Sequence, residues 1–510
     1  MENLAGPHTE ETSRLLAMIE LRPHQVEAVD QLRKSLRNGK IRPLLAAPCS
    51  MGKTMIAAHI MQCAAAKGIR SVFFCDRVKL VQQTVETFER LGAEFSVLQA
   101  DDPRYNPNAL IQIASIQTAV RRRHFTFGLA IVDECHTMYK GLIDGFMARY
   151  DNVPFIGLSA TPYAKNLGIY YDDLIQTITP RELIAKGFLC PTDYYVGKTI
   201  NTDKIKKRTI PTGGSDFDPE ALGSAMIDSE TFNGDVVENY RVHSGDLTKR
   251  AIAFSPSVAH SKALVEKFEE AGIPALHIDG YMDEEERKYI YAEHRSTEAG
   301  TALILSCSRL LGTGYDDPSV EILIDCFPTS KNSKIAWIQR AGRIWRTAEG
   351  KTKAVYLDHA GNLQRHSMFP EDVIPVELDD GTKKFDERNQ TKEEREKIVR
   401  SCPTCTTAMT GRKCPACGFE YAKETPVFQD DGQILKKVDK LPTMDDKGRW
   451  MGELLYYCDK KGWNSGAASH MYREKFGVWP KNVDRTLRSS QSADVYGFIQ
   501  MLQIRRAKRA

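Results

Sequence analysis

The segment APCSMGKT, residues 47 to 54, could bind the phosphates of a nucleotide. An apolar run precedes it and a helix-like run follows it, and in this strand–loop–helix context a GK[ST] loop binds phosphate. Backbone N–H groups of the loop would hold the phosphates, together with the positive end of the following helix. Lys53 would reach the β- and γ-phosphates, and the Thr54 hydroxyl would hold Mg²⁺. Because Ala47 stands where this motif usually begins with Gly, the segment is a weak signal by itself.

An acidic pair follows the apolar run LAIV (129–132) in the segment DECH (133–136). Ligands of open α/β sheets gather at the carboxyl ends of strands. There, Asp133 would hold Mg²⁺ through water, and Glu134 would polarise the attacking water as a general base. The alternative is a solvated acidic pair at the end of a strand. The phosphate loop about 80 residues upstream argues against that alternative.

A third polar segment, SATP (159–162), ends the apolar run FIGLSAT (155–161). Taken alone, Ser-x-Thr after a strand is most often a turn or a helix cap. Its value lies in its position, because Ser159 and Thr161 would lie at the same sheet edge as the acidic pair.

These segments require sheets to position them, and the apolar runs of the chain predict two. Buried strands alternating with amphipathic helices are typical of a parallel sheet with helices on both faces. One series of runs ends near residue 161 and a second begins after LCPTDYYV (189–196), so we expect two α/β domains in tandem. Residues 200 to 235, rich in Lys, Gly, Asp and Ser, are interpreted as an insertion or mobile loop of the second domain. The expected strands lie within 42–47, 71–76, 109–120, 128–136, 155–161, 251–256, 274–280, 301–308, 320–326 and 353–358.

Length and composition indicate a globular protein of several domains. A chain of 510 residues predicts roughly three domains. Its hydrophobic content of 42% and charged content of 27% are ordinary globular values. No uninterrupted apolar run of about 18 residues occurs, and the N-terminus has no signal-peptide pattern. We therefore expect a cytoplasmic protein without a membrane segment, in which cysteines stay reduced.

Basic residues are concentrated near the C-terminus. From Lys447 to Ala510 there are 13 Lys and Arg against five Asp and Glu, so this tail carries +8 and the rest of the chain −5 of the total +3. Such a tail indicates a polyanionic partner, and a merely solvated charged tail is the alternative. Its aromatic residues suit base stacking or, equally, the core of a small helical domain. These aromatic residues are Trp450, Tyr456, Tyr457, Trp463, Tyr472, Phe476 and Trp479.

Four cysteines form two C-x-x-C pairs separated by eight residues, and they predict a metal site. The pairs are Cys402 with Cys405 and Cys414 with Cys417. Two such turns match a tetrahedral Cys₄ zinc site. Four thiolates leave no open position for water, so the zinc would be structural. Unrelated reduced cysteines and a redox C-x-x-C are the alternatives, but no thioredoxin-like βαβ pattern surrounds the cluster.

In this order, APCSMGKT, DECH and SATP resemble motifs I, II and III of superfamily 2 helicases of the DEAD/DEAH type, here with a DECH box. LLGTGYDDP (310–318) resembles motif V, and QRAGRIWR (339–346) resembles motif VI. FCDRVKLVQQ resembles motif Ia, AFSPSVAHSKALVEKF resembles motif IV, and LRPHQ resembles the adenine-reading element. The resemblance covers residues 21 to 360. With the four-cysteine cluster, the chain is most similar to the RadD-like group of DNA-repair helicases, and its core is similar to that of type III restriction enzymes.

The resemblance implies two RecA-like domains with ATP in the cleft between them. It also implies roles for individual residues. Glu134, Gln339, Arg343 and Arg346 would be catalytic, with Arg346 as the leading arginine finger and the surface of a helix as the alternative for the arginine pair. ATP would be bound by Arg22, Gln25, Ser50, Met51, Gly52, Lys53, Thr54, Gly314 and Asp316. Mg²⁺ would be held by Thr54 and Asp133, and phosphate state would be coupled to domain closure by His136, Ser159 and Thr161.

Nucleic-acid contacts are implied for motif Ia, near Arg77 and Gln83, and for the SIQT turn (115–118). RRRH (121–124) follows directly and could add a phosphate clamp. A solvated helix end is the interpretation favoured for that run.

The resulting hypothesis is an ATP-dependent DNA helicase or translocase, an ATP hydrolase acting in DNA repair, recombination or replication. The resemblance implies single-stranded or branched DNA as a partner, together with a single-strand-binding protein. An RNA helicase, a zinc-dependent nucleic-acid-binding protein with a degenerate motor and a metal–thiolate redox protein are the alternatives. The expected order of domains is an N-terminal arm, two RecA-like domains, a charged linker, a zinc module and a basic aromatic-rich domain. Their ranges are 1–20, 21–190, 191–370, 371–400, 401–420 and 421–510.

Overall fold

The computed structural model divides into two units, each described here by itself. The first comprises residues 1–179, 201–214 and 375–429, and the second comprises residues 180–200, 215–374 and 430–510. The structure describes residues 19–122, 125–137, 142–196, 205–209, 215–227, 230–245, 247–296, 303–308, 315, 317–330, 333–366, 368–373, 377–381, 400–401, 408–409, 436–437, 444–476, 479–480, 483–492, 495–496, 498–500 and 502–503.

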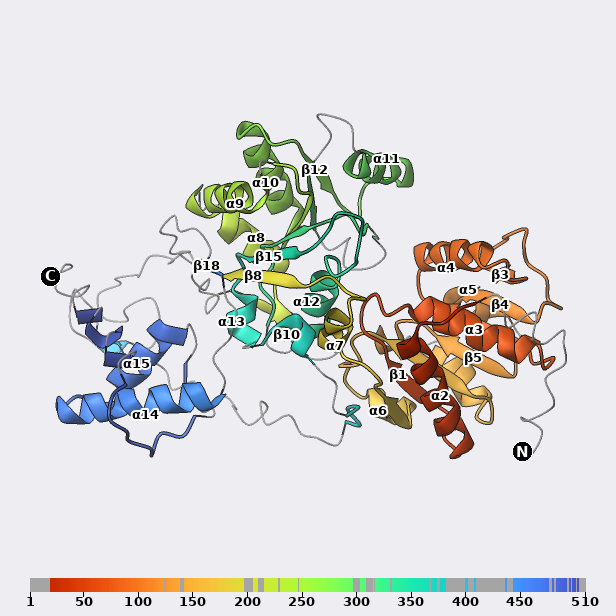
Figure 1. The fold of residues 1–510 in the computed structure, drawn as a ribbon, viewed down its shortest axis with the longest axis horizontal. Coiled ribbons are helices and arrows are strands. Elements are labelled where there is room, and N and C mark those ends of the chain that lie inside the picture. The colour runs from red at the N-terminus through yellow and green to blue at the C-terminus, as the bar shows by residue number, and fades with distance from the viewer. Residues whose placement is uncertain are drawn as a thin grey trace. The chain divides into compact units, whose positions relative to one another are not determined.

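The first unit contains a seven-stranded parallel sheet in the order β3-β4-β2-β5-β6-β1-β7. Most of its strands are buried along their whole length, as expected when helices flank a parallel sheet (Figure 1). Strand β6 lies between β5 and β1, so the ends of these three strands are neighbours at one edge. The strands are β1 (Pro43–Ala46), β2 (Ser71–Cys75), β3 (Ser96–Leu98), β4 (Ile111–Ser115), β5 (Leu129–Val132), β6 (Phe155–Ser159) and β7 (Asp173–Ile175).

The helices of the first unit are α2 (Pro23–Arg37), α3 (Lys53–Ala65), α4 (Val78–Arg90), α5 (Ile116–Arg121), α6 (Leu167–Tyr170), a 3₁₀ turn η1 (Cys135–Thr137) and a π-helical turn η2 (Leu142–Met147). Helix α2 begins with Pro at its first position, where the missing N–H costs nothing. The expected strand at 109–120 is wrong in its second half, because the chain turns into helix α5 directly after Ser115. Short strand β9 (Lys207–Thr209) and the two-residue strands β16 (Arg400–Ser401) and β17 (Ala408–Met409) also belong to this unit.

An aromatic cluster forms much of the core of the first unit. Phe74, Phe125, Phe127 and Phe146 are buried, with ring centroids of neighbouring pairs 5.5 to 6.4 Å apart. Val132 and Cys135 belong to the same core, and they flank the acidic pair on either side. The backbone that carries the two carboxylates is therefore anchored in the core at both ends.

The second unit contains another seven-stranded sheet, in the order β12-β13-β11-β14-β15-β8-β18. All its pairings are parallel except that of β18 with β8, which is antiparallel. With the first sheet, this gives two tandem RecA-like α/β domains. The strands are β8 (Thr192–Val196), β11 (Ala251–Ser255), β12 (Ala275–Ile278), β13 (Ile304–Ser308), β14 (Ile322–Asp325), β15 (Ala354–Asp358) and β18 (Lys436–Lys437), with β10 (Ser215–Phe217) outside the sheet.

The segment interpreted as an insertion or mobile loop, residues 200 to 235, contains helices where it is described, at 219–227 and from residue 230 on, so a loop is wrong for those residues, and an insertion stays a prediction. Its two helices pack against α10. Leu222 and Met226 of α8 are buried, and the Cα of Gly223 lies so close to Ser257 that no side chain fits between them. The helices of the unit are α7 (Pro180–Ala185), α8 (Pro219–Ile227), α9 (Glu230–His243), α10 (Val258–Glu270), α11 (Glu284–Arg295), α12 (Lys334–Ala341), α13 (Asn362–His366) and η3 (Pro370–Asp372).

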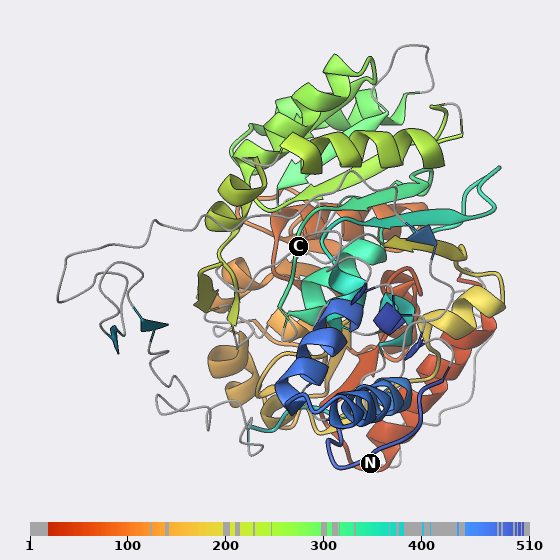
Figure 2. The same cartoon turned by 90° about the vertical axis from the view of Figure 1, so that its left-hand side faces the viewer.

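Helices α14 (Met444–Lys460) and α15 (Ser465–Phe476) pack against each other (blue in Figure 2) and share a core of their own. Trp450, Tyr457, Tyr472 and Phe476 are buried in that core, which favours the helical-core interpretation for four of the seven aromatic residues of the tail. Trp463 and Trp479 remain 40% and 39% exposed. Among the described residues, no helix combines the length and apolar character needed to cross a membrane.

Candidate nucleotide-binding site

The phosphate loop leaves the sheet at the end of β1 and closes at the start of helix α3. The N–H of Ala47 donates to the carbonyl of Ser159 across 2.8 Å, which extends the β1–β6 pairing into the loop. Ser50 and Gly52 adopt positive φ angles of 63° and 92°. Lys53 is the first residue of α3, so its side chain and the helix N-terminus lie together. The loop therefore has the turn and the helix that phosphate binding requires.

Gln25 of α2 ties that helix to the phosphate loop. Its side-chain amide donates to the carbonyl of Met51 at 2.9 Å and accepts from the N–H of Arg22 at 2.9 Å. Gln25 is buried, and its amide nitrogen occupies the space that a Cβ on Gly52 would fill. The sequence predicted Arg22 and Gln25 as adenine contacts. In this structure Gln25 contacts the loop directly, and Arg22 contacts Gln25.

Lys53 lies between the loop and the acidic pair. Its Nζ is 2.6 Å from Glu134 Oε1 and 3.9 Å from Asp133 Oδ1. Burial lowers the pKa of Lys53, but the two carboxylates outweigh it, so the pKa lies above the ordinary lysine value. The ammonium therefore stays charged and compensates the buried acids. The fold thus brings Lys53 to an acidic pair that lies 80 positions further along the chain, as the motif pattern required.

Asp133 fits the role of a magnesium ligand. Its Oδ1 is buried and accepts no hydrogen bond from any residue that the structure describes, which is costly unless a cation or water satisfies it. Burial raises the pKa of Asp133 to about 6, with Lys53 lowering it and Glu134 raising it further. A carboxylate oxygen of this kind, next to the loop that carries Thr54, matches the oxygen ligands that Mg²⁺ prefers.

Glu134 occupies a strained backbone position. Its φ of 45° lies in the left-handed region, which a residue with a long side chain rarely adopts. The strain is maintained because Val132 and Cys135 are fixed in the core on either side. In this conformation the carboxylate contacts Lys53 with one oxygen and lies 3.3 Å from His136 Nδ1 with the other.

His136, Ser159 and Thr161 form a buried chain that begins at Glu134. His136 Nδ1 and Ser159 Oγ are 2.9 Å apart, and Ser159 Oγ accepts from the N–H of Thr161 at 3.0 Å. Burial lowers the pKa of His136 although the Glu134 carboxylate raises it, so the ring is neutral near pH 7. The three residues predicted to couple phosphate state to domain motion therefore do lie in contact with one another.

The residues predicted to contact nucleic acid lie on α4 and α5. Arg77 directly precedes α4 at the N-cap position, without a capping side-chain hydrogen bond, and Gln83 lies within that helix. Gln117 of the SIQT turn donates to the carbonyl of Asp76 at 2.5 Å, which links the two segments. Arg121 ends α5 on the surface and Arg122 lies over the Tyr105 ring, as a solvated helix end would. Residues 123 and 124 lie outside the described residues.

The arginine-rich segment of the second unit spans the end of α12 and the turn after it. Gln339 lies in the helix, and Arg343 and Arg346 lie in the turn, all half-buried. Arg343 Nη1 donates to the carbonyl of Tyr315 at 2.7 Å, which joins the motif VI segment to the motif V segment. Gly314 and Asp316, predicted to bind the nucleotide, lie outside the described residues.

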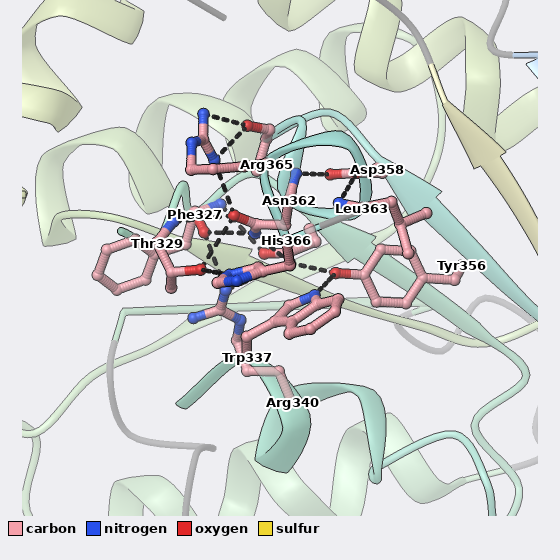
Figure 3. A network of polar contacts seen from close by, with 12 residues as sticks. Phe327, Thr329, Trp337, Arg340, Tyr356, Asp358, Asn362, Leu363, Arg365 and His366 are labelled. Atoms are coloured by element: carbon pink, nitrogen blue, oxygen red, sulfur yellow. Dashed lines mark hydrogen bonds and ion pairs between the residues drawn. The ribbon is translucent and has the colours of Figure 1, made fainter. Parts of the chain in front are cut away.

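A buried network supports helix α12, and sequence reasoning missed its central residue, Arg340 (Figure 3). Arg340 is 3% exposed and lies 3.2 Å from Asp325, and it donates to the carbonyl of Phe327 at 2.9 Å. Asp325 also accepts from Tyr356 and from Asn362. Among the arginines of QRAGRIWR, Arg340 is therefore structural. Its position one residue after Gln339, about 100° further around the helix, was the available signal.

The same network continues to the end of β15. Asp358 accepts from the backbone N–H groups of Asn362 and Leu363, and Trp337 stacks on His366 with ring centroids 4.3 Å apart (Figure 3). Burial, together with the nearby Asp325 charge, raises the pKa of Asp358 to about 7. The end of the second sheet and helix α12 are thus joined through side chains.

The cysteine cluster predicted to bind zinc, Cys402, Cys405, Cys414 and Cys417, lies outside the described residues. Within the described part of the chain, no group of three or more His, Cys, Asp or Glu side chains is arranged to hold a metal ion. The zinc site therefore stays a prediction.

Comparison with known proteins agrees with this arrangement. Residues 18–164 match the family described as "Type III restriction enzyme, res subunit", and residues 236–348 match "Helicase conserved C-terminal domain". The chain is 25% identical over 486 residues to a 51.5 kDa protein of Lactococcus phage (isolate 7-9), covering 89% of this chain and 100% of the phage protein.

Two more distant likenesses extend the comparison. The chain is 24% identical over 384 residues to IRC3 of Saccharomyces cerevisiae, assigned as an ATP-dependent helicase, covering 71% of this chain and 54% of the yeast protein. It thus spans about half the length of that relative. A fragment assigned as the HsdR subunit of a type I restriction enzyme from Vibrio vulnificus YJ016 shares the fold, with a TM-score of 0.53 and 20% identity, covering 73% of this chain and 70% of that one.

The two sheets and the phosphate-loop site define a tandem RecA-like nucleotide-binding protein. With both matched domains, the chain belongs to superfamily 2 of the helicases. Domains of this family imply an ATP-hydrolysing enzyme.

Proposed function

We propose that the protein is an ATP-driven DNA helicase or translocase. The observation that carries the proposal is the contact of Lys53 with Glu134 and Asp133, because it gathers a phosphate-binding cation, a general base and a metal ligand at one sheet edge. Nothing in the proposal requires a covalent intermediate. Positioning and electrostatic stabilisation are sufficient for phosphoryl transfer to water.

The residues of the first unit would divide the work of hydrolysis as follows. Lys53 and the loop N–H groups bind the β- and γ-phosphates. Glu134 orients the attacking water and takes its proton, and His136 lies beside that carboxylate, with Nδ1 3.3 Å from its second oxygen. Thr54 and Asp133 would hold Mg²⁺, which supplies charge neutralisation on the phosphate oxygens.

The arginines of the second unit would supply the remaining positive charge. An arginine that stabilises charge developing on the γ-phosphoryl oxygens raises the rate by roughly 10³ to 10⁵ in related NTPases. Arg346 and Arg343 are the proposed residues for this role, and Gln339 is proposed to assist them. Arg340 is excluded because it is buried in its pair with Asp325.

DNA is the proposed polymer because residues 18–164 match a subunit of a restriction enzyme, an enzyme class defined by its action on DNA. The test compares ATP hydrolysis with single-stranded DNA, duplex DNA, forked DNA and RNA side by side. We expect DNA to stimulate hydrolysis by tenfold or more and RNA to do so less. Stimulation of ATP hydrolysis by RNA alone would favour the alternative of an RNA helicase. The absence of hydrolysis under every condition would favour the alternative of a nucleic-acid-binding protein with a degenerate motor.

A role in DNA repair, recombination or replication is proposed from the resemblance to the RadD-like group. Single-stranded or branched DNA and a single-strand-binding protein are the partners that follow from it. A binding assay between the full chain and a single-strand-binding protein on single-stranded DNA tests this part. Unchanged ATP turnover and no complex in that assay would contradict it.

A structural zinc ion is proposed for the two C-x-x-C pairs, on the basis of their spacing alone. Metal analysis of the freshly purified chain should give one zinc per molecule. A Cys402→Ser variant should lose it, while a Cys458→Ser variant should keep it, because Cys458 is buried in the helical core of α14 and α15. A zinc-free protein, or a Cys402→Ser variant with full metal content, would refute the site.

A further inference from the structure

Lys351 of the second unit is held by three backbone carbonyls. Its Nζ donates to Pro318 at 3.1 Å, Val320 at 2.6 Å and Ile344 at 2.9 Å. The side chain reaches this position because the chain reverses in a turn closed by the N–H of Lys351 and the carbonyl of Ala348. All three hydrogens of the ammonium are used, one for each carbonyl.

The carbonyls of Pro318 and Val320 belong to a segment that is itself rigid. Asp317 accepts from the N–H and the hydroxyl of Ser319, at 3.0 and 2.6 Å, and from the hydroxyl of Tyr315 at 3.0 Å. The Tyr315 ring is 2% exposed and stacks on Tyr291 of α11 with ring centroids 4.9 Å apart. This segment, residues 317–320 together with Tyr315, is a fixed support that overlaps the end of the motif V segment (310–318).

The third carbonyl belongs to the turn that carries the two arginines. Arg343 and Arg346 flank Ile344 and Trp345, which are both fully buried. Lys351 holds the carbonyl of Ile344, and the N–H of Cys190 donates to the carbonyl of Trp345 at 2.7 Å. The carbonyls of Ile344 and Trp345, between the two arginines, therefore both accept a hydrogen bond.

The turn and the support are joined at two points. Arg343 Nη1 donates to the carbonyl of Tyr315, and Lys351 bridges Ile344 to Pro318 and Val320. Of these two links, the one made by Lys351 uses no arginine side chain.

We propose that Lys351 is a positioning residue for ATP hydrolysis, which fixes the turn bearing Arg343 and Arg346 to the support formed by Tyr315 and residues 317–320. Lys351 itself touches no substrate. The proposal rests on the proposed function, because it assumes that this turn acts in hydrolysis. A misplacement of about 1 Å in such a turn costs up to about 10²-fold in rate.

The protonation state of Lys351 offers a second way to test the same contacts. Burial lowers the pKa of Lys351 to about 8, while Cys190, Glu321 and Asp317 raise it and Arg346 lowers it. The ammonium has a hydrogen for each of the three carbonyls, whereas the neutral amine has only two. The bridge is thus complete below about pH 8 and loses one bond as the pH rises above it.

The experiment compares Lys351→Met, Lys351→Arg and Lys353→Met in the full-length protein, with kcat and KM for ATP measured at saturating DNA. Lys353 is the matched control, since it is an exposed lysine two residues away that forms an ion pair with Asp193 at 3.2 Å. We expect K351M to lower kcat about 10- to 100-fold with KM for ATP changed less than about threefold. K351R should recover part of kcat, and K353M should match the wild type within about twofold.

The pH dependence of kcat, compared between the wild type and K351R, tests the proposal even where K351M does not fold. The kcat of the wild type should fall as the pH rises through about 8, and this fall should be absent in K351R, because arginine stays protonated. An identical alkaline fall in the wild type and K351R, or a K351M variant with wild-type kcat, would overturn the proposal. Both results require an active wild-type enzyme, so a wild type without ATP hydrolysis would instead refute the proposed function.

Discussion

Lys53 Nζ lies 2.6 Å from Glu134 Oε1, so the cation of the phosphate loop is paired with the carboxylate proposed as general base. The second acid, Asp133, lies 3.9 Å from the same nitrogen. All three side chains are less than one-fifth exposed. Because the ammonium is the counter-charge for two buried acids, the loop and the end of β5 depend on one another for stability as well as for chemistry.

A Lys53→Ala variant should lose both ATP hydrolysis and stability. Removing the cation leaves two buried carboxylates without compensation, and breaking a buried pair in this way costs about 3 kcal/mol or more. Thermal unfolding followed by circular dichroism at pH 8 measures the loss.

Glu134→Gln is the matched control for that variant. It removes one acid and leaves Lys53 paired with Asp133, so stability should change by less than about 1 kcal/mol. Its ATP turnover should nevertheless fall roughly 10²- to 10⁴-fold, because the general base is gone. Retained ATP turnover in E134Q would contradict the role of Glu134 as general base. An unfolding midpoint of K53A equal to that of E134Q would contradict the role of Lys53 as the counter-charge of the two buried acids.

The loss of ATP hydrolysis at acid pH should follow the protonation of Asp133. Its pKa is raised to about 6 by burial, and only the ionised form can hold Mg²⁺. We therefore expect kcat/KM to fall as the pH drops through about 6. Because the metal competes with the proton, a tenfold rise in Mg²⁺ should move this fall to lower pH. A fall that stays in place at every Mg²⁺ concentration would assign the titration to another group.

Gly52→Ala should damage the phosphate loop more than the backbone strain alone explains. An alanine at a φ of 92° is strained by about 1–2 kcal/mol, and its Cβ would also collide with the Gln25 amide. Gly39→Ala is the control, because Gly39 has a φ of 83° and no atom lies within 4 Å of its added Cβ. Binding of a fluorescent ATP analogue should weaken tenfold or more in G52A only. Equal binding by the two variants would contradict the role of the Gln25 contact.

Arg340→Met should destabilise the second unit by about 3–5 kcal/mol, because it leaves Asp325 without its buried counter-charge. The double variant with Asp325→Asn should recover part of this loss, since no uncompensated charge remains. Denaturant unfolding of the single and double variants measures both effects. A double variant as unstable as the sum of the two single changes would show that the residues act independently.

Much of the fold followed from local patterns. Continuous apolar runs predicted most strands of both sheets, because strands buried on both faces leave little room for polar residues. The phosphate loop, the acidic pair and the Ser-x-Thr segment were each visible as short motifs. A loop was wrong for the helical part of residues 200 to 235, since the polar residues before α8 obscured the apolar positions of α8, which packs on α10.

The sequence by itself determined which residues could carry out nucleotide chemistry, because residue type and spacing along a strand, loop or helix are local properties. It also separated the motor from the cysteine cluster and the basic tail. Only the tertiary structure decided that Gln25 braces the loop, that Arg340 is buried against Asp325, and that Lys351 bridges two distant segments. Each of these contacts joins residues that the sheet order and burial bring together. The sequence gives the identity of a charged residue, but it does not show whether that residue will contact water, a carboxylate or a backbone carbonyl.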